Sequence, residues 1–165
     1  MGSRVMHLII ANQIAKKVSI TNVNAFLLGG IAPDAVSPKE LSHFFEGDAN
    51  DFSRTIAYDK FYRKYSNYSQ RDYIQGYYTH LIADDIWLKG FYLPWLKNRV
   101  ENDPDIFSRY HNDFQLLNSK LLSYYGITTD VLKDLDRDDS VPDLAEVTAD
   151  ELKRFLPFVK EDMNY

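Results

Sequence analysis

Apolar side chains recur along this chain mainly with the three- and four-residue spacing of an amphipathic helix, and no stretch alternates convincingly as a strand would. The spacing predicts helices over residues 3–18, 21–28, 51–65, 69–89, 104–125, 128–135 and from 148 onward. A chain of 165 residues is about the size of one domain. We therefore predict an all-α, single-domain multi-helix bundle over residues 1–165, with long loops.

Residues with strong capping or breaking preferences mark several expected helix ends. Ser3 suits the N-cap of the first helix, and Gly126 suits the position just beyond a long helix. Thr148 and Glu151 have the spacing of a capping box, which opens the last helix. Pro157 is expected to bend or interrupt that helix because it has no backbone N–H.

The region after the second helix is expected to be irregular. Gly29 and Gly30 are expected to end that helix before a turn, which places Asp34 on a loop. Residues 35–51 contain many turn-forming and small polar residues, so they predict a long connection that carries His43. Loops of this length often carry functional residues.

Composition and charge exclude several classes of function. The formal net charge is -5 and no run of Lys or Arg offsets it locally, so duplex nucleic acid is not an expected partner. There is no cysteine, so any metal must be bound by nitrogen or oxygen ligands. The N-terminal apolar run is too short and polar for a secretory signal, and no stretch approaches the roughly 18 apolar residues of a membrane span. We expect a cytoplasmic protein, and the sequence indicates no particular oligomeric state.

The clearest chemical pattern lies in the helix predicted at residues 69–89. His80 and Asp84 are four residues apart, which places both side chains on one helical face. Gly76 lies one turn earlier on that face and suits the close approach of another backbone or of a metal cluster. Asp85 is rotated by about 100° around the helix from Asp84. We therefore expect it to face outward or to orient a metal ligand without binding the metal itself.

Earlier in the chain than this pair are three more residues whose side chains are of types that can bind metals. His7 lies on the apolar face of the first predicted helix, Asp34 follows a turn sequence, and His43 lies in the long connection. Each of them, taken alone, also suits core packing, turn formation or a surface loop. Together with His80 and Asp84 they predict a buried metal site.

Four segments have the order and setting of motifs found in one enzyme family. They are His7-Leu-Ile-Ile-Ala11, Gly29-Gly-Ile-Ala-Pro-Asp34, His43-Phe44 and Gly76-Tyr-Tyr-Thr-His80-Leu-Ile-Ala-Asp84. Through these segments, which span roughly the first half of the chain, the sequence resembles the zinc-dependent phospholipase C family. That family shares an all-helical fold with bacterial phosphatidylcholine-cleaving enzymes and, more remotely, with fungal single-strand nucleases. The resemblance implies the same fold and a zinc-dependent phosphoester hydrolase.

The resemblance also implies a set of metal ligands. One zinc ion would be held by Asp34, His43, His80 and Asp84. Asp84 would bridge to a second metal that is also bound by His7. The expected cofactor is therefore Zn²⁺ in one or two copies, and another divalent ion would suit the same ligand types.

The downstream part of the family pattern is incomplete in this chain. The family uses a histidine followed four residues later by an acid; His111 supplies the histidine and is a sixth candidate ligand, but Gln115 stands in place of the acid. The secreted members also use their amino-terminal residue and a further histidine beyond the His80 to Asp84 motif, whereas residues 86–110 contain no histidine. We therefore expect one or two metal ions and not three.

These residues predict a metal-dependent hydrolase that cleaves a phosphoester with metal-activated water. Asp34 is expected to act as a ligand or, as the resemblance suggests, as the catalytic carboxylate that takes the proton of the water. The acidic composition and the absence of a signal favour a small soluble phosphoester as substrate, and the resemblance also allows a phospholipid.

Two alternatives stay open. A metal phosphohydrolase of the His-Asp type is also helical and uses scattered ligands, although its adjacent His-Asp dipeptide is missing from this sequence. A catalytically degenerate metal-binding or interaction protein of the same fold would keep part of the ligand set without turnover. Gln115, in place of the acid, favours this second alternative.

Overall fold

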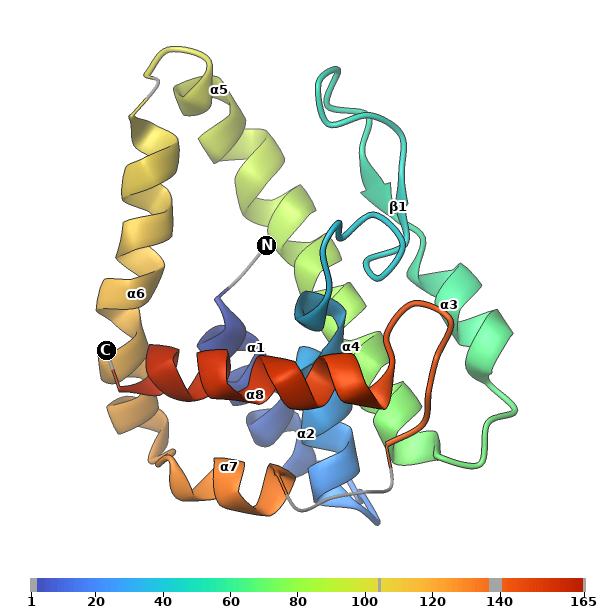
Figure 1. Cartoon of the computed structure of the whole chain (residues 1–165). Coiled ribbons are helices and arrows are strands. Elements are labelled where there is room, and N and C mark those ends of the chain that lie inside the picture. Colours follow the sequence, from blue (N-terminus) through green and yellow to red (C-terminus); the bar gives the residue numbers. More distant parts are fainter. Residues whose placement is uncertain (1–2, 104, 137–140, 165) are drawn as a thin grey trace.

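The computed structural model describes residues 3–103, 105–136 and 141–164. The elements, in chain order, are α1 (Arg4–Ala15), α2 (Val23–Ile31), η1 (Ala32–Ala35), β1 (Phe45–Glu46), β2 (Thr55–Ile56), α3 (Tyr58–Tyr65), α4 (Arg71–Trp87), η2 (Leu88–Leu96), α5 (Lys97–Val100), α6 (Ile106–Tyr125), α7 (Asp130–Leu135) and α8 (Ala149–Met163). The short η1 is a 3-10 helix and η2 is a π-helix. The described residues are mostly helical, which confirms the all-α prediction (Figure 1). None of the described helices is long and apolar enough to cross a bilayer.

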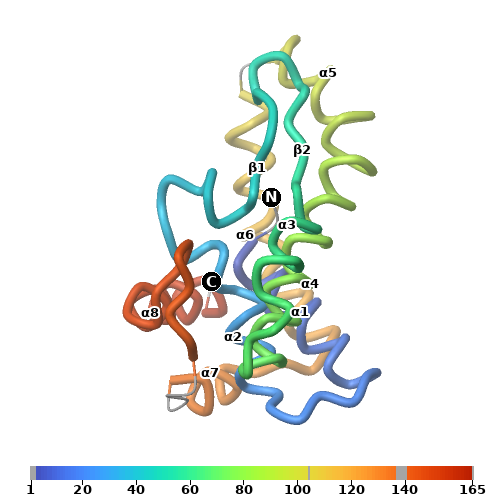
Figure 2. Tube along the Cα trace, turned by 90° about the vertical axis from the view of Figure 1, so that its right-hand side faces the viewer, coloured from blue at the N-terminus to red at the C-terminus, as the bar shows by residue number. Residues whose placement is uncertain are grey.

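Helices α1, α2 and α4 lie together in the middle of the fold, and the other helices surround them (Figures 1 and 2). Helix α8 packs against α1 and η1, and α6 packs against α1 and α8. The largest fully buried side chains include Leu8 on α1, Phe26 on α2, and Tyr73 and Tyr77 on α4. The hydrophobic core therefore lies between α1, which carries His7, and α4, which carries His80 and Asp84.

The predicted caps are confirmed. The Ser3 hydroxyl accepts a hydrogen bond from the backbone N–H of Met6 at 3.0 Å, which begins α1. Thr148 and Glu151 form the capping box of α8, with each side chain accepting from the backbone N–H of the other residue. Gly126 ends α6 with a φ of 64°, a conformation that glycine adopts without strain.

Glycines allow α2 and α4 to touch backbone to backbone. A Cβ atom on Gly29 would lie 2.1 Å from the carbonyl oxygen of Tyr73, and one on Gly76 would lie 2.0 Å from that of Phe26. The predicted approach of another backbone to Gly76 is therefore confirmed. The expectation that Gly29 and Gly30 end the second helix is wrong, because α2 runs through both. Glycine suits both positions because neighbouring helices come too close there for a side chain.

Residues 51–65 do not form the single helix that their apolar spacing predicts. Helix α3 begins only at Tyr58, and β2 pairs antiparallel with β1 just before it. Between the two strands, Gly47 and Phe52 have positive φ values of 77° and 62°, which no right-handed helix contains. Pairing with a segment earlier in the chain thus outweighs the local helical pattern.

Two prolines lie inside helical segments without ending them. Pro94 lies in η2, which continues α4 beyond the end expected at residue 89. Pro157 lies in α8, which continues to Met163, so the predicted interruption does not occur. Pro157 is exposed on the outer face of α8. The expected start of α6 at residue 104 lies outside the described residues.

Replacing Gly76 with alanine should destabilise the fold, because the added methyl group must displace the backbone of α2 at Phe26. Overpacking of this kind costs about 1–3 kcal/mol in the free energy of unfolding, which urea denaturation measures. Gly90→Ala is the matched control, since a Cβ there meets nothing within 4 Å. It should be neutral or slightly stabilising. Equal stabilities of the two variants would contradict the backbone contact.

Candidate metal centre

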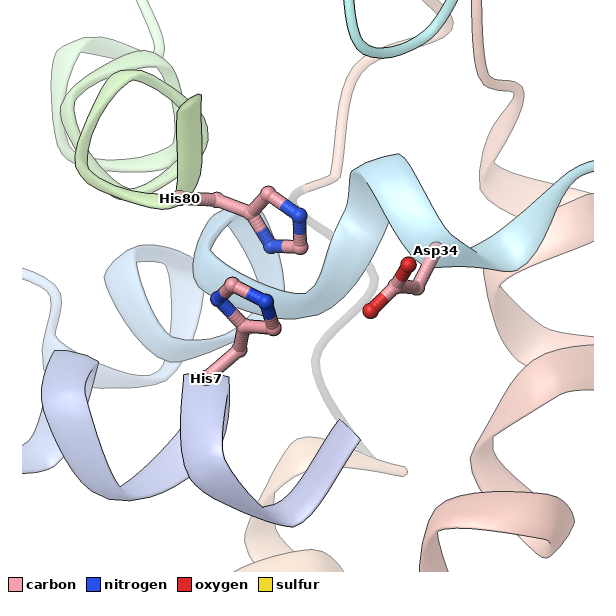
Figure 3. A group of neighbouring side chains, drawn as sticks. All are labelled: His7, Asp34 and His80. Carbon is pink, nitrogen blue, oxygen red and sulfur yellow. The ribbon is translucent and has the colours of Figure 1, made fainter. Parts of the chain in front are cut away.

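Five of the predicted ligands meet in one buried cluster, although they come from four separate segments. His7 comes from α1, Asp34 from η1, His43 from the residues before β1, and His80 and Asp84 from α4. Asp34 is 8% exposed and the other four are 3% exposed or less. In Figure 3, His7, Asp34 and His80 extend from three different segments toward a common region. Asp34 lies in η1, directly after α2, and not on the predicted loop.

The nitrogen and oxygen atoms of this cluster are closely spaced. Nε2 of His43 lies 3.3 Å from Nε2 of His80, and 3.5 Å from one oxygen each of Asp34 and Asp84. Nε2 of His80 lies 3.7 Å from Oδ2 of Asp84. Nε2 of His7 lies 3.2 Å from Oδ1 of the same carboxylate. Asp84 therefore directs one oxygen to His7 and the other to the remaining two histidines.

A backbone carbonyl fixes the protonation of His80. Nδ1 of His80 lies 2.9 Å from the carbonyl oxygen of Gly30. A carbonyl oxygen only accepts, so Nδ1 carries the proton and donates it. Burial and the neighbouring His7 hold the pKa of His80 well below its ordinary value, so the ring is neutral. Its Nε2 therefore presents a lone pair to the cluster.

His43 is oriented in the same way by a hydroxyl group. The Ser42 hydroxyl donates its single proton to the carbonyl of Pro33 at 2.8 Å, so it can only accept from Nδ1 of His43, 3.0 Å away. Burial lowers the pKa of His43, against the opposing effect of Asp34. The Nε2 atom of His43 is thus a second lone pair that faces the cluster.

His7 is buried with both ring nitrogens lacking a hydrogen bond. Its ring stacks on that of His80, with the centroids 3.7 Å apart. Nε2 is close to Asp84 without the alignment of a hydrogen bond. A buried polar group without a partner costs about 1–3 kcal/mol. The position of His7 is therefore better suited to a metal ligand than to a core residue.

Both carboxylates of the cluster are ionised at neutral pH. Burial alone would raise the pKa of Asp34, but its contact with His43, the nearby imidazoles and Lys39 together outweigh burial and hold the pKa well below its usual value. Burial likewise favours the neutral form of Asp84, and the nearby His7 is the largest of the effects that overcome it and lower its pKa. The cluster thus places two negative charges in a buried region.

The donor set fits a divalent metal ion. Two ionised carboxylates and two imidazole lone pairs point at one another; Lys39 offsets the charge of Asp34, and a divalent cation among the ligands would offset the remaining charge. In a tetrahedral zinc site with bonds of about 2.0–2.1 Å, neighbouring ligand atoms are about 3.3–3.4 Å apart. The separations reported above run from 3.2 to 3.7 Å, so they are near this value or slightly longer. Metal-binding histidines are also commonly oriented by a hydrogen bond from their other ring nitrogen to a backbone carbonyl, as His80 is here.

Two adjoining clefts reach the cluster. The first, called here the polar cleft, has a volume of about 570 Å³ and contains Asp34. The second, the aromatic cleft, has a volume of about 370 Å³ and contains His43. Lys39 and His111 line both, so they lie where the clefts adjoin. A separate apolar groove of about 400 Å³ touches His7 and Asp84.

The two remaining predicted site residues do not join the five. His111 is exposed on α6, and its Nδ1 lies 2.8 Å from the carbonyl oxygen of Phe107. It lies on the walls of the clefts, outside the groups of closely spaced ligand atoms found among the described residues. Asp85 is buried and forms an ion pair with Lys89 at 2.7 Å. Its role in orienting a ligand stays a prediction.

Three groups that shape the cluster are not among the residues that the sequence predicts. Ser42 and the carbonyl of Gly30 fix the two imidazoles. Lys39 forms an ion pair with Asp34. Adjacency to His43 is a usable signal for Ser42. A backbone carbonyl has no sequence signal, and the contact of Lys39 depends on the path of an irregular segment.

Comparisons with known proteins add no further constraint. No protein-family model matches the chain, and searches of curated proteins and of solved structures gave no match.

Replacing Asp84 with asparagine should weaken zinc binding by roughly 100-fold or more. Mutating a residue that only hydrogen-bonds to a metal ligand already lowers metal affinity about 10- to 100-fold, and losing a ligand should cost at least as much. Asp84 contacts all three histidines of the cluster. Isothermal titration calorimetry measures the affinity, and zinc should also raise the Tm of the wild type. Asp59→Asn, at an exposed position of α3, is the control and should bind like the wild type. Unchanged affinity in Asp84→Asn would place any bound zinc elsewhere.

Replacing Ser42 with alanine should lower zinc affinity about 10-fold while leaving the ligand set intact. The hydroxyl accepts a hydrogen bond from the Nδ1–H group of His43, and its loss frees the ring to adopt the other tautomer. The same titration measures the effect, and circular dichroism verifies that the variant is folded. A folded Ser42→Ala protein with wild-type affinity would show that this hydrogen bond does not set the tautomer.

Proposed function

We propose that this protein is a metal-dependent hydrolase of phosphoesters and that the buried cluster is its active site. The observation that carries the proposal is the set of two ionised carboxylates and two inward-facing imidazole lone pairs beside a polar cleft. Such a site binds a divalent ion and leaves room for a substrate next to it.

The proposed cofactor is Zn²⁺ or another divalent ion, in one or two copies. Asp34, His43, His80 and Oδ2 of Asp84 would hold the first ion. His7 and Oδ1 of Asp84 would contribute to a second. The two Asp84 oxygens point to different histidines, which supports the bridging role implied by the resemblance to the zinc-dependent phospholipase C family.

Bound divalent ions supply Lewis acidity, which stabilises phosphoryl charge and makes water nucleophilic at neutral pH. The residues of the chain decide where this chemistry acts. Asp34 is the carboxylate that reaches the polar cleft, where a water molecule and a substrate can enter. Its lowered pKa suits a ligand and weakens it as a base, so ligation is its first proposed role and proton acceptance its second.

A small phosphoester is the proposed substrate. The polar cleft offers amide groups such as Asn112, which suit polar substituents of a substrate. It also contains Arg4 and Lys39, which are paired with Asp162 and Asp34 and could turn to a phosphoryl group. A phospholipid is the second substrate candidate, and the apolar groove beside His7 and Asp84 is the feature that favours it. The test below includes both.

A metal-binding protein without turnover is the second candidate function. Gln115 lines the polar cleft at the position where the resemblance calls for an acid, and His111 lies outside the buried cluster. The five ligands are thus fewer than the family uses. The His-Asp-type alternative gains no support, because the cluster is built from His and Asp residues that are not adjacent in sequence.

The proposal is tested with zinc-loaded protein and a panel of phosphomonoesters, phosphodiesters and phosphatidylcholine vesicles. We expect hydrolysis of at least one soluble ester, and a loss of about 1,000-fold or more in kcat/KM for Asp84→Ala, as when a group essential to chemistry is removed. Asp59→Ala should retain wild-type activity. Bound zinc without hydrolysis of any ester would favour the binding protein, and hydrolysis of vesicles alone would favour the phospholipid.

A further inference from the structure

The aromatic cleft differs sharply in chemistry from the polar cleft beside it. Its walls contain five aromatic side chains, which are Phe45, Phe52, Tyr92, Phe107 and Tyr110. They come from the β1–β2 hairpin, from η2 and from α6, and Figure 2 shows these segments at the same end of the fold. A volume of about 370 Å³ is enough for a single ring with substituents.

A stack of side chains connects this cleft to the metal centre. The His43 ring stacks on Phe45, with the centroids 5.2 Å apart. The guanidinium carbon of Arg54 lies 4.5 Å from the centre of the Phe45 ring. His43 and Arg54 both line the cleft. A ligand in the cleft would therefore lie beside aromatic side chains and a guanidinium group, and next to His43.

Two cationic side chains, Lys39 and Arg54, line the aromatic cleft, and one of them also lines the polar cleft. Lys39 lines both, and its side chain is 49% exposed. Nε of Arg54 is buried without a hydrogen bond, and the guanidinium is 3.9 Å from Glu40, too far for a strong pair. Lys39 is paired with Asp34, and Glu40 also lines the cleft, so these two cations become available to an anion when a metal ion neutralises Asp34.

We infer that the aromatic cleft binds an aromatic leaving group, so that the substrates are aryl phosphoesters. This inference rests on the proposed hydrolase. The phosphoryl group would lie at the junction of the clefts beside Lys39, with the ring among Phe45, Phe107 and Tyr110. Water would form a new P–O bond, the P–O bond to the aryl oxygen would break, and the aryl alcohol would leave with a proton from the water.

The chemistry of the cleft favours an aromatic ring over a saturated one. Aromatic pairs gain edge and face contacts beyond the burial of apolar area, and a guanidinium group adds a cation–π contact. An alkyl ester of the same size would gain only the burial term. We expect a phenyl group to bind about threefold to tenfold more tightly than a cyclohexyl group.

Binding of phenylphosphonate, cyclohexylphosphonate and methylphosphonate tests this inference, because their C–P bonds resist hydrolysis. Isothermal titration calorimetry, with and without zinc, should give the order phenyl, cyclohexyl, methyl, with at least tenfold between the first and the last. Phe107→Ala should reduce the phenyl preference at least threefold. Phe158→Ala, with 51% exposure against 47% for Phe107, is the matched control and should bind like the wild type.

The cationic part of the cleft is tested with Arg54→Gln, which should weaken all three phosphonates, and phenylphosphonate most, because that ligand also loses the cation–π contact. Arg63→Gln, at an exposed position outside the clefts, is its control. Equal affinities for phenyl- and methylphosphonate in folded wild type would overturn the inference, as would an unchanged preference in Phe107→Ala.

Turnover separates this inference from the proposed function. Hydrolysis of phenyl phosphate and glycerol phosphate at similar kcat/KM would keep the hydrolase and overturn the aryl specificity. The phenyl preference in binding, with no zinc-dependent hydrolysis of either ester, would overturn the hydrolase and leave the cleft as a site for aromatic anions. At least tenfold higher kcat/KM for phenyl phosphate would support both.

Discussion

The backbone contact between α2 and α4 determines where the ligands of the cluster lie. At Gly29 and Gly76 the two helices meet with no side chain between them. This contact brings the carbonyl of Gly30 to Nδ1 of His80, which fixes the proton on that ring and turns its lone pair inward. Asp84 follows one turn later on the same face. The packing that joins the central helices therefore also sets the protonation of the candidate site.

The cluster is costly to the fold unless something binds it. Two buried carboxylates and the unpartnered nitrogens of His7 each lose favourable contacts with water, at about 1–3 kcal/mol for a neutral group and more for a charged one. A domain has a net stability of only about 5–15 kcal/mol. Buried apolar neighbours such as Tyr77 and Leu81 offset this cost. A ligand of the folded state would offset it further.

Helical periodicity placed His80 and Asp84 on one face from sequence alone, because their spacing is local. The approach of His7 depends on tertiary packing, which the spacing of residues does not encode. Glycine signals both helix ends and close helix contacts, so Gly29 inside α2 was open to the wrong interpretation. The two-residue strands are shorter than any periodic pattern. The contact of Lys39 with Asp34 follows from an irregular path that no motif describes.

The two clefts give the proposed reaction a direction. In-line displacement at phosphorus needs the attacking and leaving oxygens on opposite sides of the phosphoryl group. Asp34 faces the polar cleft and His43 faces the aromatic cleft, although their nearest ligand atoms are only 3.5 Å apart. A phosphoryl group at this junction would meet water from one cleft and release its leaving group into the other. Lys39, which lines both clefts, would neutralise charge at the point where they adjoin.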